Sequence, residues 1–176
     1  MPADQSLPLS ALDEALLAEV ATKADLVWVA VPPQPAKALW HVWHDGAVAV
    51  VTGGREQRDP GLVDQQTVEL ILRSKDKITR VLTVPATVHR LDPADEQWLA
   101  VAKALHPKRL NATDGESQPE RWRTESSLWL LQPMGPSTEG PGHLSDESHR
   151  AAPLLTDATT DRQRPFHLGK ATRKRR

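Results

Sequence analysis

The sequence predicts a mainly β (α+β) protein, a small antiparallel β-barrel with peripheral helices, and three observations lead to this fold class. Short apolar runs recur between turn residues, as strands do. Helical patterns stand only before and after the main run of strands, so the alternation typical of a βαβ fold is absent. The pair Asp45-Gly46 between two apolar runs is the strongest hairpin signal in the chain.

Two amphipathic helices are predicted, over residues 10–24 and 93–106. Ser10 and Asp92 can cap their N-termini, and Pro93 occupies the first position of the second helix. Both helices have an apolar stripe at helical spacing, made of Leu12, Leu16, Leu17 and Val20 in the first and of Trp98, Ala102 and Leu105 in the second.

Six strands are predicted, five between the helices and one after them, at residues 26–31, 38–44, 47–52, 67–75, 77–91 and 127–132. The first three are short apolar runs. The fourth alternates, so that Val68, Leu70 and Leu72 share one face. Pro85 inside the fifth strand implies an edge, a bulge or a sharp bend.

Beyond residue 132 the sequence has no period, and Pro, Gly, Ser, Thr and Asp dominate. Such a segment cannot bury enough apolar surface to offset its ordering entropy. We therefore predict one folded domain over residues 1–132, with the barrel at about 25–132, and a disordered tail over 133–176. The basic run at 170–176 is typical of a solubilising end, with weak contact to nucleic acid or acidic lipid as the alternative.

Composition excludes several classes of site. The 176 residues include no Cys, which rules out a disulfide framework, a thiolate metal site and a Cys nucleophile. With 22 Lys and Arg against 23 Asp and Glu, the chain lacks the basic excess of a generic nucleic-acid binder. No apolar run approaches the ~20 residues that span a bilayer, and no signal peptide is recognisable. We therefore expect a cytoplasmic protein without membrane contact.

Two basic segments could hold an anion. Residues 53–55, Gly-Gly-Arg, combine close backbone approach with a guanidinium that forks onto phosphate; a polar turn is the alternative. The densest basic cluster of the domain consists of Arg73, Lys75, Lys77 and Arg80. Arg73 and Lys75 share a strand face and can present two cations to one phosphate, whereas a solvated hairpin end is the alternative.

Aromatic and histidine residues cluster in the second strand. Trp40 and Trp43 are predicted to face opposite sides, so one should pack the barrel and the other could face a partner subunit or stack on a ring system. Core packing of both is the alternative. His41 and His44 also face opposite sides, which argues against a joint metal site. The loop before the last strand could line a pocket at a dimer interface or stay solvated, with an Arg stacked on Trp. The candidate residues there are Lys108, Arg109, Asn111, Arg121 and Trp122.

Residues 37–52 resemble the second and third strands of the flavin-binding split barrels, the proteins similar to pyridoxamine 5′-phosphate oxidase. They contain an aromatic-rich strand, a hairpin of the Asp-Gly type, an apolar strand and a terminal Thr52, as that family does. The strand at 77–91, the helix at 93–106 and the last strand fit the same order. Three further stretches resemble an uncharacterised bacterial branch of the group, at residues 73–77, 109–111 and 121–122.

This resemblance implies a split β-barrel that forms a homodimer, with FMN or a deazaflavin bound at the subunit interface. It implies an oxidoreductase in which a hydride moves between the flavin ring and an unknown small substrate. Trp43 would contact the ring or the partner subunit. The residues expected to hold phosphate or other anionic groups are Thr52, Arg55, Arg73, Lys75 and Arg80. No catalytic residue is identifiable, because no nucleophile or acid–base pair stands out.

One departure from the family pattern favours a different function. After the third strand the family commonly has a Ser-Arg-Lys-like loop and a short helix that help to hold the phosphate. Here residues 53–61 have no second cation directly next to Arg55, and they have no helical pattern. The alternative is therefore a non-catalytic binding or interaction protein on the same barrel that has lost the cofactor.

Overall fold

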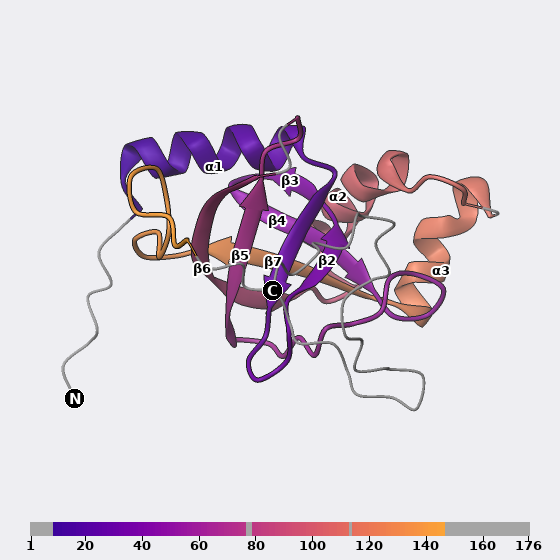
Figure 1. Cartoon of the computed structure of the whole chain (residues 1–176). Helices are drawn as coiled ribbons and strands as arrows, with labels where there is room; N and C mark the ends of the chain where they lie inside the picture. The colour runs from indigo at the N-terminus through magenta and orange to yellow at the C-terminus, as the bar shows by residue number, and fades with distance from the viewer. Residues whose placement is uncertain (1–8, 77–78, 113, 147–176) are drawn as a thin grey trace, which may run out of the picture. The chain divides into compact units, whose positions relative to one another are not determined.

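The computed structural model describes residues 9–76, 79–112 and 114–146. In this part of the chain, one antiparallel sheet of seven strands curls into a nearly closed barrel, which confirms the predicted fold class (Figure 1). The order of the strands in the sheet is β2-β1-β5-β6-β7-β4-β3. Their bounds are β1 Leu26–Ala30, β2 Lys37–Trp40, β3 Val42–His44, β4 Ala47–Thr52, β5 Thr67–Arg73, β6 Arg80–Arg90 and β7 Ser127–Pro133.

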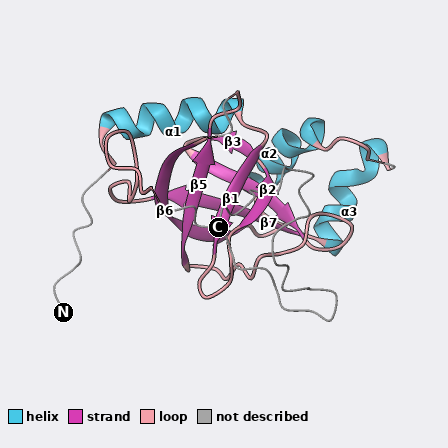
Figure 2. Ribbon diagram, viewed as in Figure 1, coloured by secondary structure: helices cyan, strands magenta, loops and turns pink. Residues whose placement is uncertain are grey.

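Helices lie outside the barrel (Figure 2). They are α1 Ala11–Lys23, α2 Glu96–Leu105 and α3 Gln118–Glu125, with the 3₁₀ turns η1 His106–Lys108 and η2 Gly115–Ser117. As predicted, the Ser10 hydroxyl caps α1 by accepting a hydrogen bond from the backbone N–H of Asp13 at 3.1 Å. Asp92 caps a turn instead of a helix, so α2 begins later than expected. Within the described residues, no helix has the length and apolar character needed to span a bilayer.

The expected strand at 38–44 is two strands, which separate at His41. β2 pairs with β1, whereas β3 pairs with β4 at the other end of the sheet order. A single flat strand could not serve both partners, so the chain turns at His41 and nearly closes the barrel there. The hairpin between β3 and β4 follows the prediction, with positive φ of 47° at Asp45 and 80° at Gly46.

Pro85 lies inside β6, opposite Glu69 of β5. On the other side of β6, pairing with β7 stops at the Ala86–Pro133 pair. Pro85 has no N–H group to donate, and it lies where the neighbouring strand β7 ends. A barrel strand can contain a proline at such a position.

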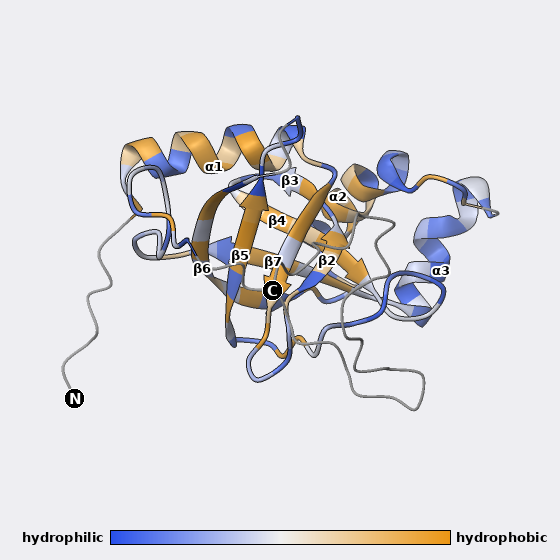
Figure 3. Cartoon of the chain, viewed as in Figure 1, coloured by the Kyte–Doolittle hydropathy of each residue, from blue (hydrophilic) through white to orange (hydrophobic). Residues whose placement is uncertain are grey.

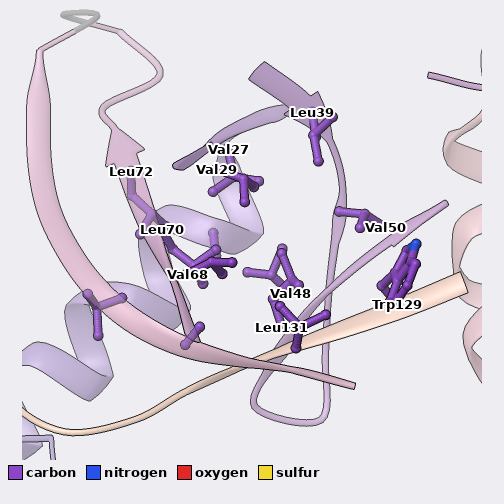
Figure 4. Packing of buried hydrophobic residues seen from close by; sticks show 14 of the residues in the cluster. Val27, Val29, Leu39, Val48, Val50, Val68, Leu70, Leu72, Trp129 and Leu131 are labelled. Atoms are coloured by element: carbon purple, nitrogen blue, oxygen red, sulfur yellow. The ribbon is translucent and has the colours of Figure 1, made fainter. Parts of the chain in front are cut away.

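Two apolar clusters form the core. One fills the barrel and includes Leu17 of α1, and Figure 4 shows Val48, Leu131 and Val68 converging there from different strands. The other lies between the outer face of β4 and β7 and the helices α2 and α3, where Trp98 is 1% exposed and Trp122 fully buried. β4 is buried on both faces because it separates the two clusters.

The described fold extends past the expected boundary at residue 132. Residues 134–146 turn back onto β6, where the backbone N–H of Thr83 donates to the carbonyl of Glu139 at 2.9 Å. The side chains of Arg80 and Glu139, both mostly buried, form an ion pair of 3.1 Å. This ion pair and the backbone bonds order a segment that has little apolar surface. The rest of the tail that we predict to be disordered, residues 147–176, lies outside the described residues.

Candidate ligand-binding site

An open cavity of about 570 Å³ lies where α1 ends beside β2 and β3. Its walls come from the chain between Ala21 and Leu26, from residues 40–43 at the β2–β3 junction, and from residues 107–111 after α2. Both α1 and α2 pack against β3, which brings these three segments together (Figure 2). The volume lies within the roughly 300–1,000 Å³ typical of small-molecule sites.

Two half-buried indoles line this space, which we call the Trp cavity: Trp40 at the end of β2 and Trp43 in β3. Trp43 packs against the cluster inside the barrel, whereas Trp40 packs against the cluster under α2. Each indole is therefore anchored by the core and still forms part of the cavity wall. Aromatic rings anchored in this way can stack on a planar ligand.

His41, between the two tryptophans, is 5% exposed. Its Nε2 donates a hydrogen bond of 2.9 Å to the carbonyl of Ala21 in α1. Burial lowers the pKa of His41 below its ordinary value, although the bond to Ala21 opposes this effect. The imidazole is therefore neutral at pH 7 and ties the β2–β3 junction to the end of α1.

The segment 107–111 gives the Trp cavity positive charge. Lys108 is exposed and forms no ion pair with any residue that the structure describes. Arg109 lines the cavity with a side chain that is 28% exposed. The one acidic residue of the lining, Asp25, lies 3.7 Å from Lys75 and pairs with it.

A buried carboxylate fixes this basic segment in place. Glu56 lies in the loop after β4, and its side chain is fully buried. Its Oε2 accepts a hydrogen bond from Nε of Arg109 at 2.6 Å, and its Oε1 accepts one from Nη2 of Arg121 at 2.8 Å. Asp114 pairs with Nε of the same Arg121. Burial alone would raise the pKa of Glu56, but the nearby Trp122 indole and the guanidinium groups of Arg121 and Arg109 together hold it below its ordinary value.

Gln57, the next residue, holds the edge of β2. Its Oε1 accepts from the backbone N–H of Trp40 at 2.9 Å, and its Nε2 donates to the carbonyl of Trp40 at 3.0 Å. An amide side chain thus occupies the position of a neighbouring strand. The loop after β4 therefore braces both Trp40 and Arg109, which are two parts of the cavity wall.

Two of the residues predicted to bind phosphate lie away from the Trp cavity. Thr52 ends β4 and is 1% exposed. Its hydroxyl donates to Oδ2 of Asp59 at 2.6 Å and accepts from Nε1 of Trp129 at 2.9 Å. Arg55 is exposed and lies 3.9 Å from the carboxylate of Glu125. The Thr52 hydroxyl therefore serves the internal packing of the barrel end.

The other predicted residues divide into two groups. Arg73 and Lys75 line a smaller pocket of about 120 Å³ that shares residues 24–26 with the Trp cavity. The Arg73 guanidinium also lies 5.9 Å from the centre of the Trp28 ring. Arg80 lies elsewhere and is held by Glu139. The structure therefore places Trp43, Arg73 and Lys75 around one stretch of chain and separates them from Thr52, Arg55 and Arg80.

Sequence reasoning missed Glu56, Gln57 and the contribution of residues 21–26. Lys108 and Arg109 were expected in a pocket or a solvated loop, and they line a pocket. A charged residue in a polar loop carries no signal of burial, so only the partners Arg109 and Arg121 reveal the role of Glu56. Among the described residues, no group of three or more His, Asp or Glu is placed to hold a metal ion.

Comparison with known proteins gives a structural likeness. No family model matches the chain, and no curated protein matches it in sequence. A solved structure that it resembles is that of HutZ, the heme storage protein from Vibrio cholerae, with 15% sequence identity and a TM-score of 0.48. The match covers 68% of this chain and 89% of HutZ.

Proposed function

We propose that the chain is a binding protein that takes a planar, anionic aromatic molecule into the Trp cavity. The single observation that carries this proposal is the combination, in one cavity of about 570 Å³, of two anchored indoles with Lys108 and Arg109. Indoles favour the face of a planar ring, and the cations favour a carboxylate or a phosphate. FMN and a deazaflavin both have this chemistry and are our first candidate ligands.

This proposal shares with the alternative the absence of catalysis, and it differs from the alternative in keeping a flavin as a candidate ligand. In the loop after β4, Glu56 and Gln57 hydrogen-bond to other residues of the same chain. The Thr52 hydroxyl already has two hydrogen-bond partners. These contacts support a protein in which that loop braces the cavity wall instead of cradling a phosphate. Flavin-dependent hydride transfer is our second candidate, favoured by the openness of the Trp cavity beside Trp43, through which a substrate could reach a bound ring.

The phosphate of a flavin bound in this way has two candidate positions. Lys108 and Arg109 line the Trp cavity itself, whereas Arg73 and Lys75 line the smaller pocket that adjoins it. Lys75 is already paired with Asp25, and Arg73 lies over Trp28. We therefore propose Lys108 and Arg109 as the first anion-binding pair and keep Arg73 and Lys75 as the competing pair.

Titration of the purified protein with FMN, followed by quenching of tryptophan fluorescence, tests the proposed function. We expect saturable binding that survives gel filtration and is weakened at least about tenfold by Trp43→Leu, because the stacking surface is lost. Trp28→Leu is the matched control, since Trp28 lines neither pocket. Hemin, another planar anion, serves as a second probe. The proposal would be contradicted if neither the tryptophan fluorescence nor the melting temperature of the protein changes on addition of FMN, a deazaflavin or hemin.

We also propose that the chain forms a homodimer, as the family resemblance implies. Leu26 and Leu110, both at the Trp cavity, are 44% and 74% exposed, so a second copy could bury apolar surface there. Size-exclusion chromatography with light scattering should give twice the chain mass of 19.4 kDa. A mass that stays at that of one chain at high protein concentration would contradict the dimer.

A further inference from the structure

We propose that Arg109 binds the anionic group of the ligand and that Glu56 is the positioning residue that aims its guanidinium. This inference rests on the proposed function in one respect, since the anionic group belongs to the molecule in the Trp cavity. It names the group that this molecule must carry, a carboxylate or a phosphate oxygen within reach of residue 109.

Two of the three guanidinium nitrogens of Arg109 are already fixed. Nε donates to Oε2 of Glu56 at 2.6 Å, and Nη1 donates to the carbonyl of Leu110 at 2.6 Å. The third nitrogen, Nη2, makes no hydrogen bond to any residue of the described chain. Because the group is planar, fixing Nε and Nη1 also fixes the direction in which Nη2 can donate. The side chain lines the Trp cavity, and the two N–H groups of Nη2 are donors that Arg109 can offer to a ligand.

The surrounding charges determine which residue attracts the anion. Glu56 and Asp114 together balance Arg109 and Arg121, so this cluster of four side chains has no net charge. Arg109 therefore adds little net positive charge to the cavity, and its contribution to anion binding is a donor held in a fixed direction. Lys108, exposed beside it and outside any ion pair with the described residues, supplies the attraction. Recognition of an anion by one aimed guanidinium donor and one neighbouring ammonium is a common division of roles.

The inference predicts an asymmetry between the two carboxylates of the cluster. Glu56→Gln removes the charge that holds Nε of Arg109, whereas Asp114→Asn removes one of the two carboxylate partners of Arg121 and leaves Arg109 in place. Both variants remove one negative charge from the same cluster. Only the first should change the donor that faces the ligand, so Asp114→Asn is the matched control.

The experiment follows the side-chain N–H resonances of Arg109 by ¹⁵N NMR during titration with inorganic phosphate and, separately, with benzoate. In the wild-type protein we expect saturable shifts at Arg109 with both probes. In Glu56→Gln, checked for folding by circular dichroism, the affinity should fall at least about tenfold, and in Asp114→Asn it should stay within about twofold. Arg109→Lys, followed through the backbone amide shifts of residues 108–111, should bind no better than Glu56→Gln, because an ammonium cannot reproduce the fixed donor.

A second arm separates this inference from the proposed function. It compares the affinity of the protein for FMN with its affinity for riboflavin, which has the same ring system and no phosphate. If FMN binds but phosphate and benzoate leave the Arg109 resonances unmoved, the inference is overturned and the proposed function stands. If the small anions bind at Arg109 and no planar ligand binds, the inference stands and the ligand class is wrong. Equal affinities of wild type and Glu56→Gln for phosphate would overturn the positioning role of Glu56. If Lys75→Ala abolishes FMN binding and leaves the Arg109 resonances unaffected, the anionic group belongs in the adjoining pocket and the inference is overturned.

Discussion

Replacement of Trp98 by Ala should destabilise the protein by about 3–5 kcal/mol, a large share of the stability of a domain of this size. Trp98 is 1% exposed and lies in the cluster between α2 and the outer face of the barrel. One face of its ring also carries the guanidinium of Arg123, at 4.4 Å from the ring centre. The substitution therefore leaves a large cavity and removes a cation–π contact between α2 and α3.

Equilibrium unfolding in urea, followed by far-ultraviolet circular dichroism, measures this loss. The matched control is Leu99→Ala on the same helix, because Leu99 is 42% exposed and its truncation should change the free energy of unfolding by no more than about 0.5 kcal/mol. A loss below about 1 kcal/mol for Trp98→Ala would mean that α2 does not pack on the barrel as described.

Replacement of Glu56 by Ala should cost about 3 kcal/mol, since it leaves two guanidinium groups without the buried carboxylate that they share. The effect lies at the lower end of the range for broken buried pairs because Arg109 is partly exposed. Arg55→Ala, in the same loop, is the control: its ion pair is exposed and long, so little change is expected. If the two variants unfold at the same urea concentration, Glu56 does not hold the loop.

The same carboxylate should make stability depend on pH. The pKa of Glu56 is lowered in the folded state, so its contribution is fully present above the pKa of an unfolded Glu, about 4.3, and is lost as the pH falls through the folded value. The free-energy difference between the wild type and Glu56→Gln should therefore be constant from about pH 6 to 8 and shrink below about pH 4.5. A difference that grows on acidification would contradict the lowered pKa.

Two predictions that depended on neighbours in sequence held. The alternation of β5 buries Val68, Leu70 and Leu72, and the Asp45-Gly46 turn has the two positive φ angles that its residue types favour. The helix α3 was missed because it has no apolar stripe, and Figure 3 shows it as hydrophilic. Only Trp122 and Gln118 are buried along it, and its position is set by contacts with Glu56 and the second cluster.

The candidate site was less accessible to sequence reasoning, and Thr52 shows why. A threonine that follows an apolar strand is a reasonable phosphate ligand until its hydroxyl is seen to bond Asp59 and Trp129. The second of these partners is far away in the sequence, and spacing along the chain cannot reveal such competition. Arg109 is the opposite case, because a loop cation with no pattern of its own becomes a cavity residue once α2 packs on β3.

The amide of Gln57 on the backbone of Trp40 has a consequence for self-association. β2 and β3 are the two ends of the sheet, so the seam of the barrel exposes strand edges that could template a foreign strand. At Trp40 both backbone groups are occupied by one side chain of the same molecule. The Gln57 side chain therefore blocks the exposed strand edge at the end of β2. A strand of another molecule cannot hydrogen-bond to the backbone N–H and carbonyl of Trp40, so strand-to-strand polymerisation cannot start there.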